Sequence, residues 1–262
     1  MASVGGAELD VGILVDVCAE IGKVCPSTAW NFGNLASHHW MLGYYEPETQ
    51  DEIWDVSPDT LIATSLAFPA GRGRKVEGGW EVTGRWPLSS GVDNSDWNML
   101  GFNVRERDDG PPIEQRFGLL HRSQYEIIDT WHAVGLAGTG SKDVAATKVF
   151  VPERRTSGVL AMTGKPHPGS KVNPSPLFRL PMMALGPYVL SGVMLGCARG
   201  AYASETYKTA GSMIDLERQF YSAADVVAYL PLGQIRQPFA WRRNVSGVLK
   251  ANNMVFWNIS KA

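Results

Sequence analysis

A series of short apolar or alternating segments between about residues 60 and 152 constrains the fold more than any other feature of the sequence. Turns that contain glycine, proline or aspartate, such as PAGRG, VEGG and RDDGPP, separate these segments. Regularly spaced short strands with such turns are typical of an antiparallel sheet, closed as a sandwich or barrel. The segments are LIATSLAF, GGWEVTGRWPL, WNMLGFNV, RFGLLHR and YEIIDTW, and DVAATKVFVP closes the region.

Helical patterns lie on both sides of this β region. Residues 8–24 carry apolar side chains at three- and four-residue steps, which makes one apolar face. Pro26 then marks a break, and Ser27 is predicted to cap the next helix. Helical signals return from about residue 182. The sequence therefore predicts an α+β fold, and the predicted segments are a helical one at 1–57, an antiparallel β domain at 58–156 and a helical one at 157–262.

The later helical segment has two features of its own. Gly192, Gly196 and Gly200 lie four residues apart on one helical face, where a second helix can approach closely. The 19 residues Leu180–Ala198 carry no charge but include two prolines, so they predict a buried helix with an irregular start and not a membrane span.

Composition excludes several classes of partner. The 24 lysines and arginines against 26 aspartates and glutamates give a net charge of −2 with no basic block, which argues against binding to nucleic acid or to an anionic membrane. Three cysteines, an odd number, without a visible signal peptide predict a cytoplasmic protein. Their spacing predicts no metal site.

Several stretches, in order and at matching spacing over about 150 residues, resemble the acyl-CoA dehydrogenase fold. The resemblance is closer to the flavin-dependent monooxygenases built on that fold, the oxygenase components of two-component aromatic hydroxylases. It implies that the chain holds a partial N-terminal helical segment, the β middle domain, and part of a C-terminal helical bundle. The stretches are GGAELD at 5–10, CPSTAW at 25–30, HHWML at 38–42, GGWEVTGRWPLSSGVDNSDW at 78–97 and DTWHAVGLAGTGSKDVAATKVFVPERR at 129–155.

The dehydrogenase branch is matched less well. Its members carry Thr-Glu-Pro before Ala-Gly-Ser-Asp where this chain has TSLAFPAGRG, and the Glu and Asp are missing here. The paired serines of WPLSSG resemble the hydroxylase branch instead.

The resemblance places Ser89 and Ser90 beside a flavin. A reduced flavin that has reacted with O2 is useful only if its N5–H is held by an acceptor in a dry pocket. A serine hydroxyl at the end of a strand suits that role, and Ser90 is favoured over Ser89. The alternative is a strand-end turn whose hydroxyls bond the local backbone.

Four more hydroxyl residues are candidates for contact with the cofactor. Thr64 and Ser65 lie on the strand that in this family runs beside flavin and substrate, although ordinary strand packing explains them equally well. Thr139 and Ser141 lie in GLAGTGS, a loop near the flavin in the family, where turn geometry is the alternative.

The resemblance also marks the HHW segment as a lining of the substrate site. Alignment of Trp40 with a family tryptophan puts His38 at the catalytic position, and Trp40 is a candidate for contact with the cofactor. A histidine there can accept or orient a phenolic proton, because its usual pKa lies near neutral. A satisfied core histidine is an equal alternative.

The expected function is therefore that of an oxygenase component that hydroxylates a small aromatic, phenolic substrate. It would use reduced FMN or FAD from a separate NAD(P)H-dependent flavin reductase, and members of the family are commonly homotetramers. The alternatives are an acyl-CoA dehydrogenase-like FAD enzyme and a non-catalytic, incomplete relative.

Overall fold

The computed structural model describes residue 6 and residues 8–107, 110–203, 245–246 and 260–261. The chain divides into two compact units, Met1–Val227 and Ala228–Ala262. Within the second, β9 (Val245–Ser246) pairs antiparallel with β10 (Ser260–Lys261). All that follows concerns the first unit.

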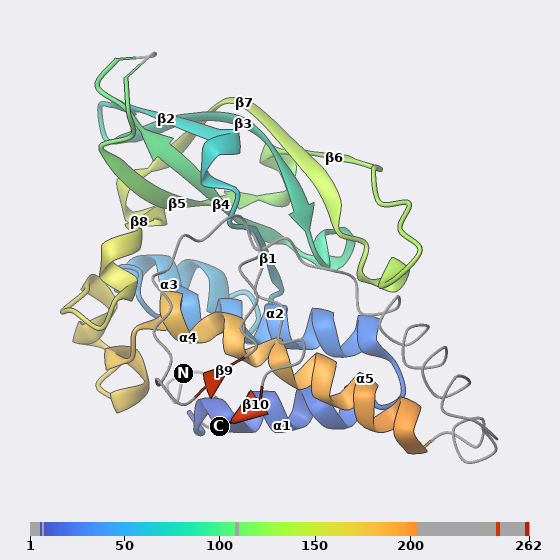
Figure 1. Cartoon of the computed structure of the whole chain (residues 1–262). Helices are drawn as coiled ribbons and strands as arrows, with labels where there is room; N and C mark the ends of the chain where they lie inside the picture. Colours follow the sequence, from blue (N-terminus) through green and yellow to red (C-terminus); the bar gives the residue numbers. More distant parts are fainter. Residues whose placement is uncertain (1–5, 7, 108–109, 204–244, 247–259, 262) are drawn as a thin grey trace. The chain divides into compact units, whose positions relative to one another are not determined.

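Three helices open the first unit: α1 (Val11–Gly22), α2 (Pro26–Leu42) and α3 (Pro47–Trp54) (Figure 1). Prolines begin α2 and α3, at the position where a missing N–H costs the helix nothing. The predicted cap of α2, Ser27, was two positions out of place, because Pro26 is already helical and Cys25 is the residue that precedes the helix.

The β region is one eight-stranded sheet in the order β6-β7-β3-β2-β4-β5-β8, with β1 also paired to β4. Strands β3 and β7 pair along most of their length, from Gly79 opposite Pro152 to Ser89 opposite Lys142, and the turn that begins at Ser90 follows β3 directly. The strands are β1 (Ile62–Ser65), β2 (Gly71–Val76), β3 (Gly79–Ser89), β4 (Trp97–Val104), β5 (Glu114–His121), β6 (Glu126–Ile128), β7 (Lys142–Pro152) and β8 (Thr156–Gly158).

The sheet is mixed, and not purely antiparallel as the strand pattern predicted. Both β1 and β2 pair parallel with β4. The chain reverses between β2 and β3 and again between β3 and β4, so β4 returns in the direction of β2. The pattern of apolar residues gives the number of strands but not the partner of each.

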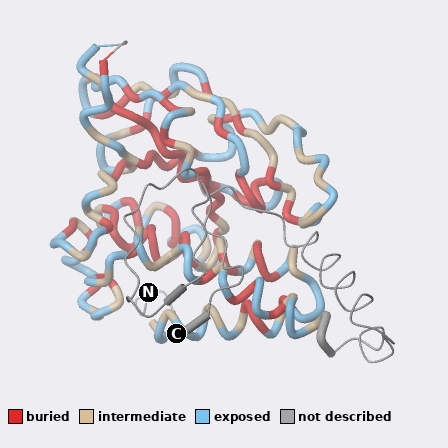
Figure 2. The backbone as a smooth tube through the Cα atoms, in the orientation of Figure 1, coloured by how far each residue is buried: buried red, intermediate tan, exposed pale blue. Residues whose placement is uncertain are grey.

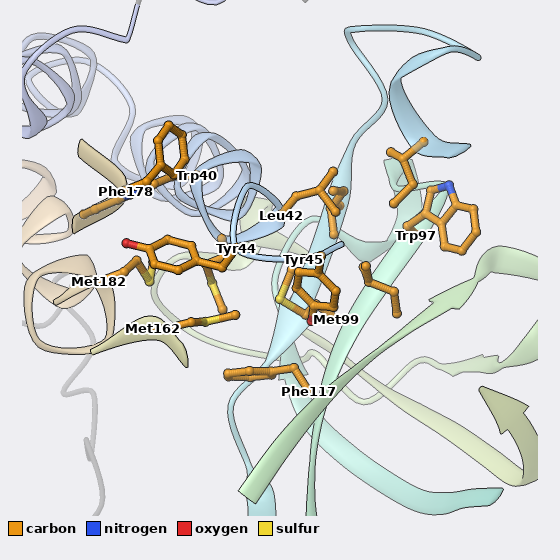
Figure 3. Packing of buried hydrophobic residues seen from close by; sticks show 14 of the residues in the cluster. Trp40, Leu42, Tyr44, Tyr45, Trp97, Met99, Phe117, Met162, Phe178 and Met182 are labelled. Atoms are coloured by element: carbon orange, nitrogen blue, oxygen red, sulfur yellow. The ribbon is translucent and has the colours of Figure 1, made fainter. Parts of the chain in front are cut away.

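Strand β4 is buried along its whole length, and its alternate side chains enter two different cores. Trp97 and Met99 join the core between helices and sheet, which Figure 3 shows around Tyr44, Tyr45 and Phe117. On the other face of β4, Leu100, Phe102 and Val104 pack in a second core, called here the sheet interior. Figure 2 marks the buried stretches of the strand region in red. The sheet interior is formed by Ala63, Trp80, Val82, Trp86, Val92, Leu100, Phe102, Val104, Leu120, Tyr125, Val144, Ala146 and Val151.

Helices α4 (Met182–Val189) and α5 (Ser191–Ala203) return after a segment of short 3-10 turns. The predicted glycine ridge is confirmed on α5: a Cβ on Gly192 or Gly196 would lie 2.2 Å from a carbonyl oxygen of α1, so the two helices touch at their backbones.

The window Met182–Gly200 is long and apolar enough to cross a membrane, judged by length and composition, with a mean hydropathy of 1.2. It consists of two helices and not one, and only 28% of it is buried, less than predicted. In the described part of the chain α5 packs on α1, and Tyr188 of α4 and Leu195 of α5 are exposed.

The predicted domain boundaries at 57 and 156 stay predictions, and the predicted C-terminal segment extends beyond the described residues.

Candidate active site

The adjacent serines at the end of β3 have separate environments. Ser89 is fully buried, and its Oγ accepts a hydrogen bond from Asn98 Nδ2 at 2.9 Å. Ser90 Oγ accepts from Trp30 Nε1 at 3.0 Å and shares a 2.7 Å hydrogen bond with Ser141 Oγ. Ser89 is the last residue of β3 and Ser90 the first of the turn that follows, and it is Ser90 that bonds a residue of helix α2.

A chain of hydroxyl groups continues from Ser90. Ser141 Oγ lies 2.6 Å from Thr139 Oγ1, and Thr139 Oγ1 donates to the carbonyl of Leu136 at 2.9 Å. The backbone N–H of Gly91 also donates to the Thr139 carbonyl at 2.9 Å, which joins the end of β3 to the short 3-10 helix η5 (Ala137–Thr139). Ser90 thus forms one polar cluster with Thr139 and Ser141, of which Ser141 lies 51 residues further along the chain.

Helix α2 covers both parts of this cluster. It packs on β1 and on η5. Gly91 has φ +74°, a conformation that favours glycine, and a Cβ there would lie 3.4 Å from Leu35 of α2. A Cβ on Gly138 would lie 3.1 Å from Ser27 at the start of α2. Small residues in both loops therefore let the helix bring Trp30 to Ser90.

His38 lies two turns after Trp30 on the same helix. Its side chain is buried, and Nδ1 is 2.6 Å from the carbonyl oxygen of Ile62 in β1. A carbonyl only accepts, so Nδ1 carries the proton and Nε2 of the neutral ring is left as an acceptor. Burial lowers the pKa of His38 to about 4, against the opposing effect of that hydrogen bond, so the ring is neutral at pH 7.

Thr64 and Ser65 of β1 are held by backbone carbonyls. Thr64 Oγ1 donates to Met99 O at 2.5 Å and Ser65 Oγ donates to Pro87 O at 2.7 Å. Each hydroxyl therefore donates its proton to a backbone carbonyl, and each hydroxyl oxygen can still accept a hydrogen bond from another group.

Hydrogen bonds join three of the predicted site residues, Ser90, Thr139 and Ser141. Ser89 points into the sheet interior with Asn98. Trp40 packs in the core between helices and sheet, beside the aromatic residues drawn in Figure 3.

Sequence reasoning missed Trp30. It lies within the CPSTAW stretch that matches the family pattern, eight residues before His38, so it lies about 12 Å along the same helix. That spacing was the available signal, but nothing in it points to Ser90.

No protein-family model matches the chain. Individual relatives do. The oxygenase subunit HsaA of a flavin-dependent monooxygenase from Mycobacterium tuberculosis is 36% identical over 200 residues, which are 76% of this chain and 50% of that protein. The oxygenase component of an FADH2-dependent resorcinol hydroxylase from Rhizobium is 35% identical over 201 residues, covering 76% and 49%. The chain thus spans about half the length of the curated relatives it matches.

Solved structures agree. The 3-HSA hydroxylase of Rhodococcus sp. RHA1 superposes with a TM-score of 0.76 at 31% identity, over 86% of this chain and 60% of that one. XiaF from Streptomyces, solved with FADH2 and glycerol, gives a TM-score of 0.68 at 26% identity, over 87% and 60%. Over the part of their length that it spans, the chain is therefore a relative, in sequence and in structure, of the oxygenase subunits of flavin-dependent monooxygenases, which have the acyl-CoA dehydrogenase fold.

Proposed function

We propose that this chain acts as the oxygenase component of a two-component flavin-dependent monooxygenase. It takes reduced FMN or FAD and O2 and hydroxylates a small phenolic substrate. The similarity to oxygenase subunits supports the reaction class. The observation that carries the proposal is that helix α2 positions two polar groups. Its Trp30 donates a hydrogen bond to Ser90, and its His38 is buried and neutral.

The groups around Ser90 fit a reduced flavin. The N5–H of a reduced flavin is a donor and needs an acceptor in a site shielded from water. Ser90 Oγ is a hydroxyl oxygen in a position almost closed to solvent, on a strand end and under a helix. Ser90 would hold the N5 proton, and the acceptor oxygens of Thr64 and Ser65 are suited to donors elsewhere on the cofactor or substrate. Bound reduced flavin supplies the electrons that activate O2 for transfer of one oxygen atom.

His38 is suited to the phenol. With Nδ1 committed to Ile62, Nε2 of the neutral ring accepts the phenolic O–H. Withdrawal of that proton raises electron density on the aromatic ring, which the ring needs in order to accept an electrophilic oxygen. The depressed pKa keeps Nε2 free to accept throughout the neutral range.

We further propose that a separate NAD(P)H-dependent reductase supplies the flavin, as the terms oxygenase subunit and oxygenase component imply for the relatives. A cytoplasmic location and assembly as a homotetramer are part of the same proposal. They rest on the cysteine usage and on the family resemblance.

The test is rapid mixing of the protein and reduced FMN or FAD with oxygenated buffer, followed by the return of oxidised-flavin absorbance. We expect a delay relative to free flavin, which Ser90→Ala abolishes. Ser95→Ala is the matched control, because Ser95 is a nearby buried serine whose hydroxyl donates to Gly91 O. It should keep the delay.

The same mixtures with resorcinol or another simple phenol should yield hydroxylated product. His38→Gln should lose most of the product while it keeps the delay, because the glutamine does not take up a phenolic proton. Reoxidation at the free-flavin rate with both flavins would contradict the proposed function.

A further inference from the structure

We infer that Thr139, Ser141 and Trp30 are positioning residues that fix the direction of the Ser90 O–H, so that Ser90 meets its ligand only as an acceptor. This inference rests on the proposed function, and it gives Thr139 and Ser141 an indirect role in place of the predicted contact with the cofactor. Trp30 has no role in the predictions from sequence.

The direction of each O–H bond follows from the number of hydroxyl protons available, beginning with Thr139, which is furthest from Ser90. A carbonyl cannot donate, so the single hydroxyl proton of Thr139 goes to Leu136 O. The 2.6 Å contact between Thr139 and Ser141 then needs the Ser141 proton. That leaves Ser141 able only to accept from Ser90 in their 2.7 Å contact. All three O–H groups therefore run the same way, from Ser90 to the carbonyl.

The same assignment of protons determines which hydrogen-bonding positions on Ser90 Oγ remain free. Its oxygen has one proton and two lone pairs. The proton goes to Ser141, and the Trp30 N–H, which can only donate, occupies one lone pair. One lone pair remains among the described contacts, and it is the position that a flavin N5–H requires.

Burial makes this arrangement stable. The side chains of Trp30, Ser90, Thr139 and Ser141 belong to residues that are at most 9% exposed, so water competes little for their hydrogen bonds. In such surroundings successive hydrogen bonds polarise one another, which strengthens the acceptor at the head of the chain.

The carbonyl of Leu136 is itself held in place. It accepts from Thr139 N at 3.0 Å and from Trp131 Nε1 at 3.2 Å besides the Thr139 hydroxyl. Leu136 has φ +54°, an unfavourable conformation for a branched side chain, so the loop is built to present this oxygen. The Leu136 carbonyl therefore keeps its orientation when the Thr139 hydroxyl is removed.

Thr139→Val is the decisive variant because valine has the shape of threonine without the hydroxyl. Ser141 then lacks its acceptor and donates to Ser90 instead. The Ser90 proton is displaced toward the place of the N5–H, where two donors oppose each other. Thr139→Ser keeps the hydroxyl and is the matched control.

The first readout needs no flavin. The indole N–H resonance of Trp30, identified by its loss in Trp30→Phe, reports the acceptor strength of Ser90. We expect it to shift in Thr139→Val and in Ser141→Ala but to stay in place in Thr139→Ser and Ser95→Ala. An unchanged resonance in both Thr139→Val and Ser141→Ala would show that the hydroxyls do not act as one chain, and would overturn the inference.

The second readout is the delay in flavin reoxidation. Loss of one hydrogen bond of ordinary strength predicts a delay shortened about tenfold in Thr139→Val, with the parent delay kept in Thr139→Ser. If Ser90→Ala abolishes the delay and Thr139→Val leaves it intact, the inference fails and the proposed function stands. If the parent protein gives no delay with either flavin, both fail.

Discussion

The sheet interior and the junction between α2 and the end of β3 both bury polar groups, but they use them differently. In the interior, Ser89 Oγ accepts a hydrogen bond from the Asn98 side chain, and the Trp86 indole N–H donates to Gly101 O. Both hydrogen bonds therefore join residues of the same sheet. At the junction, Ser90 ends a chain of hydrogen bonds with one acceptor position to spare. The two adjacent serines thus differ in their partners: Ser89 bonds a side chain within the sheet, whereas Ser90 bonds helix α2 and the loop that carries Thr139 and Ser141.

The largest expected effect concerns stability and falls in the sheet interior. Trp86 is fully buried, and a Cβ on Gly71 or Gly84 would lie within 2.7 Å of its ring, so the glycines are shaped around it. Trp86→Ala should lower the free energy of unfolding by about 3–5 kcal/mol through the cavity it leaves. Urea denaturation measures it. Trp30→Phe, at the junction, keeps an aromatic ring and should cost far less; equal losses would remove the contrast between the two regions.

A second effect, on the pH dependence of stability, distinguishes the junction. The pKa of His38 is about 4 in the folded protein against 6.5 for the usual group, so the unfolded chain binds the extra proton between these values. The free energy of unfolding is therefore highest above pH 6.5 and decreases as the pH falls toward 4. The total decrease due to His38 is about 3 kcal/mol.

His38→Gln should flatten that part of the curve, since glutamine still donates to Ile62 O and does not titrate. Urea denaturation at several pH values between 4 and 7.5 tests this. His132→Gln, at an exposed position, is the control. Parallel curves for the parent and His38→Gln would mean that His38 is not held neutral by burial.

The smallest effect separates the two serines directly. Ser89→Ala leaves the buried Asn98 Nδ2 without its partner and should cost about 1–3 kcal/mol in unfolding free energy. The delay in flavin reoxidation should not change, in contrast to Ser90→Ala. Measurement of both quantities on the two variants would refute the comparison if Ser89→Ala also abolished the delay.

Local patterns in the sequence predicted most of the elements. Alternating segments with turns between them marked the strands, and the break at Pro26 marked the boundary before α2, because these signals act over a few residues. The exchange of Cys25 for Ser27 as the residue before α2 shows the usual error of such signals, which is one of boundaries.

Pairing over long distances escaped the local patterns. The strand pattern does not say that β1 and β2 run parallel to β4, since the same alternation suits either direction. Of the predicted site residues, the resemblance named Ser90, Ser141 and Thr139 together, but it gave no reason for their contact. Trp30 was missed because its partner Ser90 lies 60 residues away.

By itself, the sequence determined that this chain is an α+β protein, that a serine pair and a glycine end one of its strands, and that it resembles flavin-dependent oxygenases. Only the tertiary structure decided which serine faces α2 and which groups hold it. The reason is physical: a residue's type gives its donors and acceptors, but which of them are used depends on neighbours that the folded chain brings from 50 or 60 residues away.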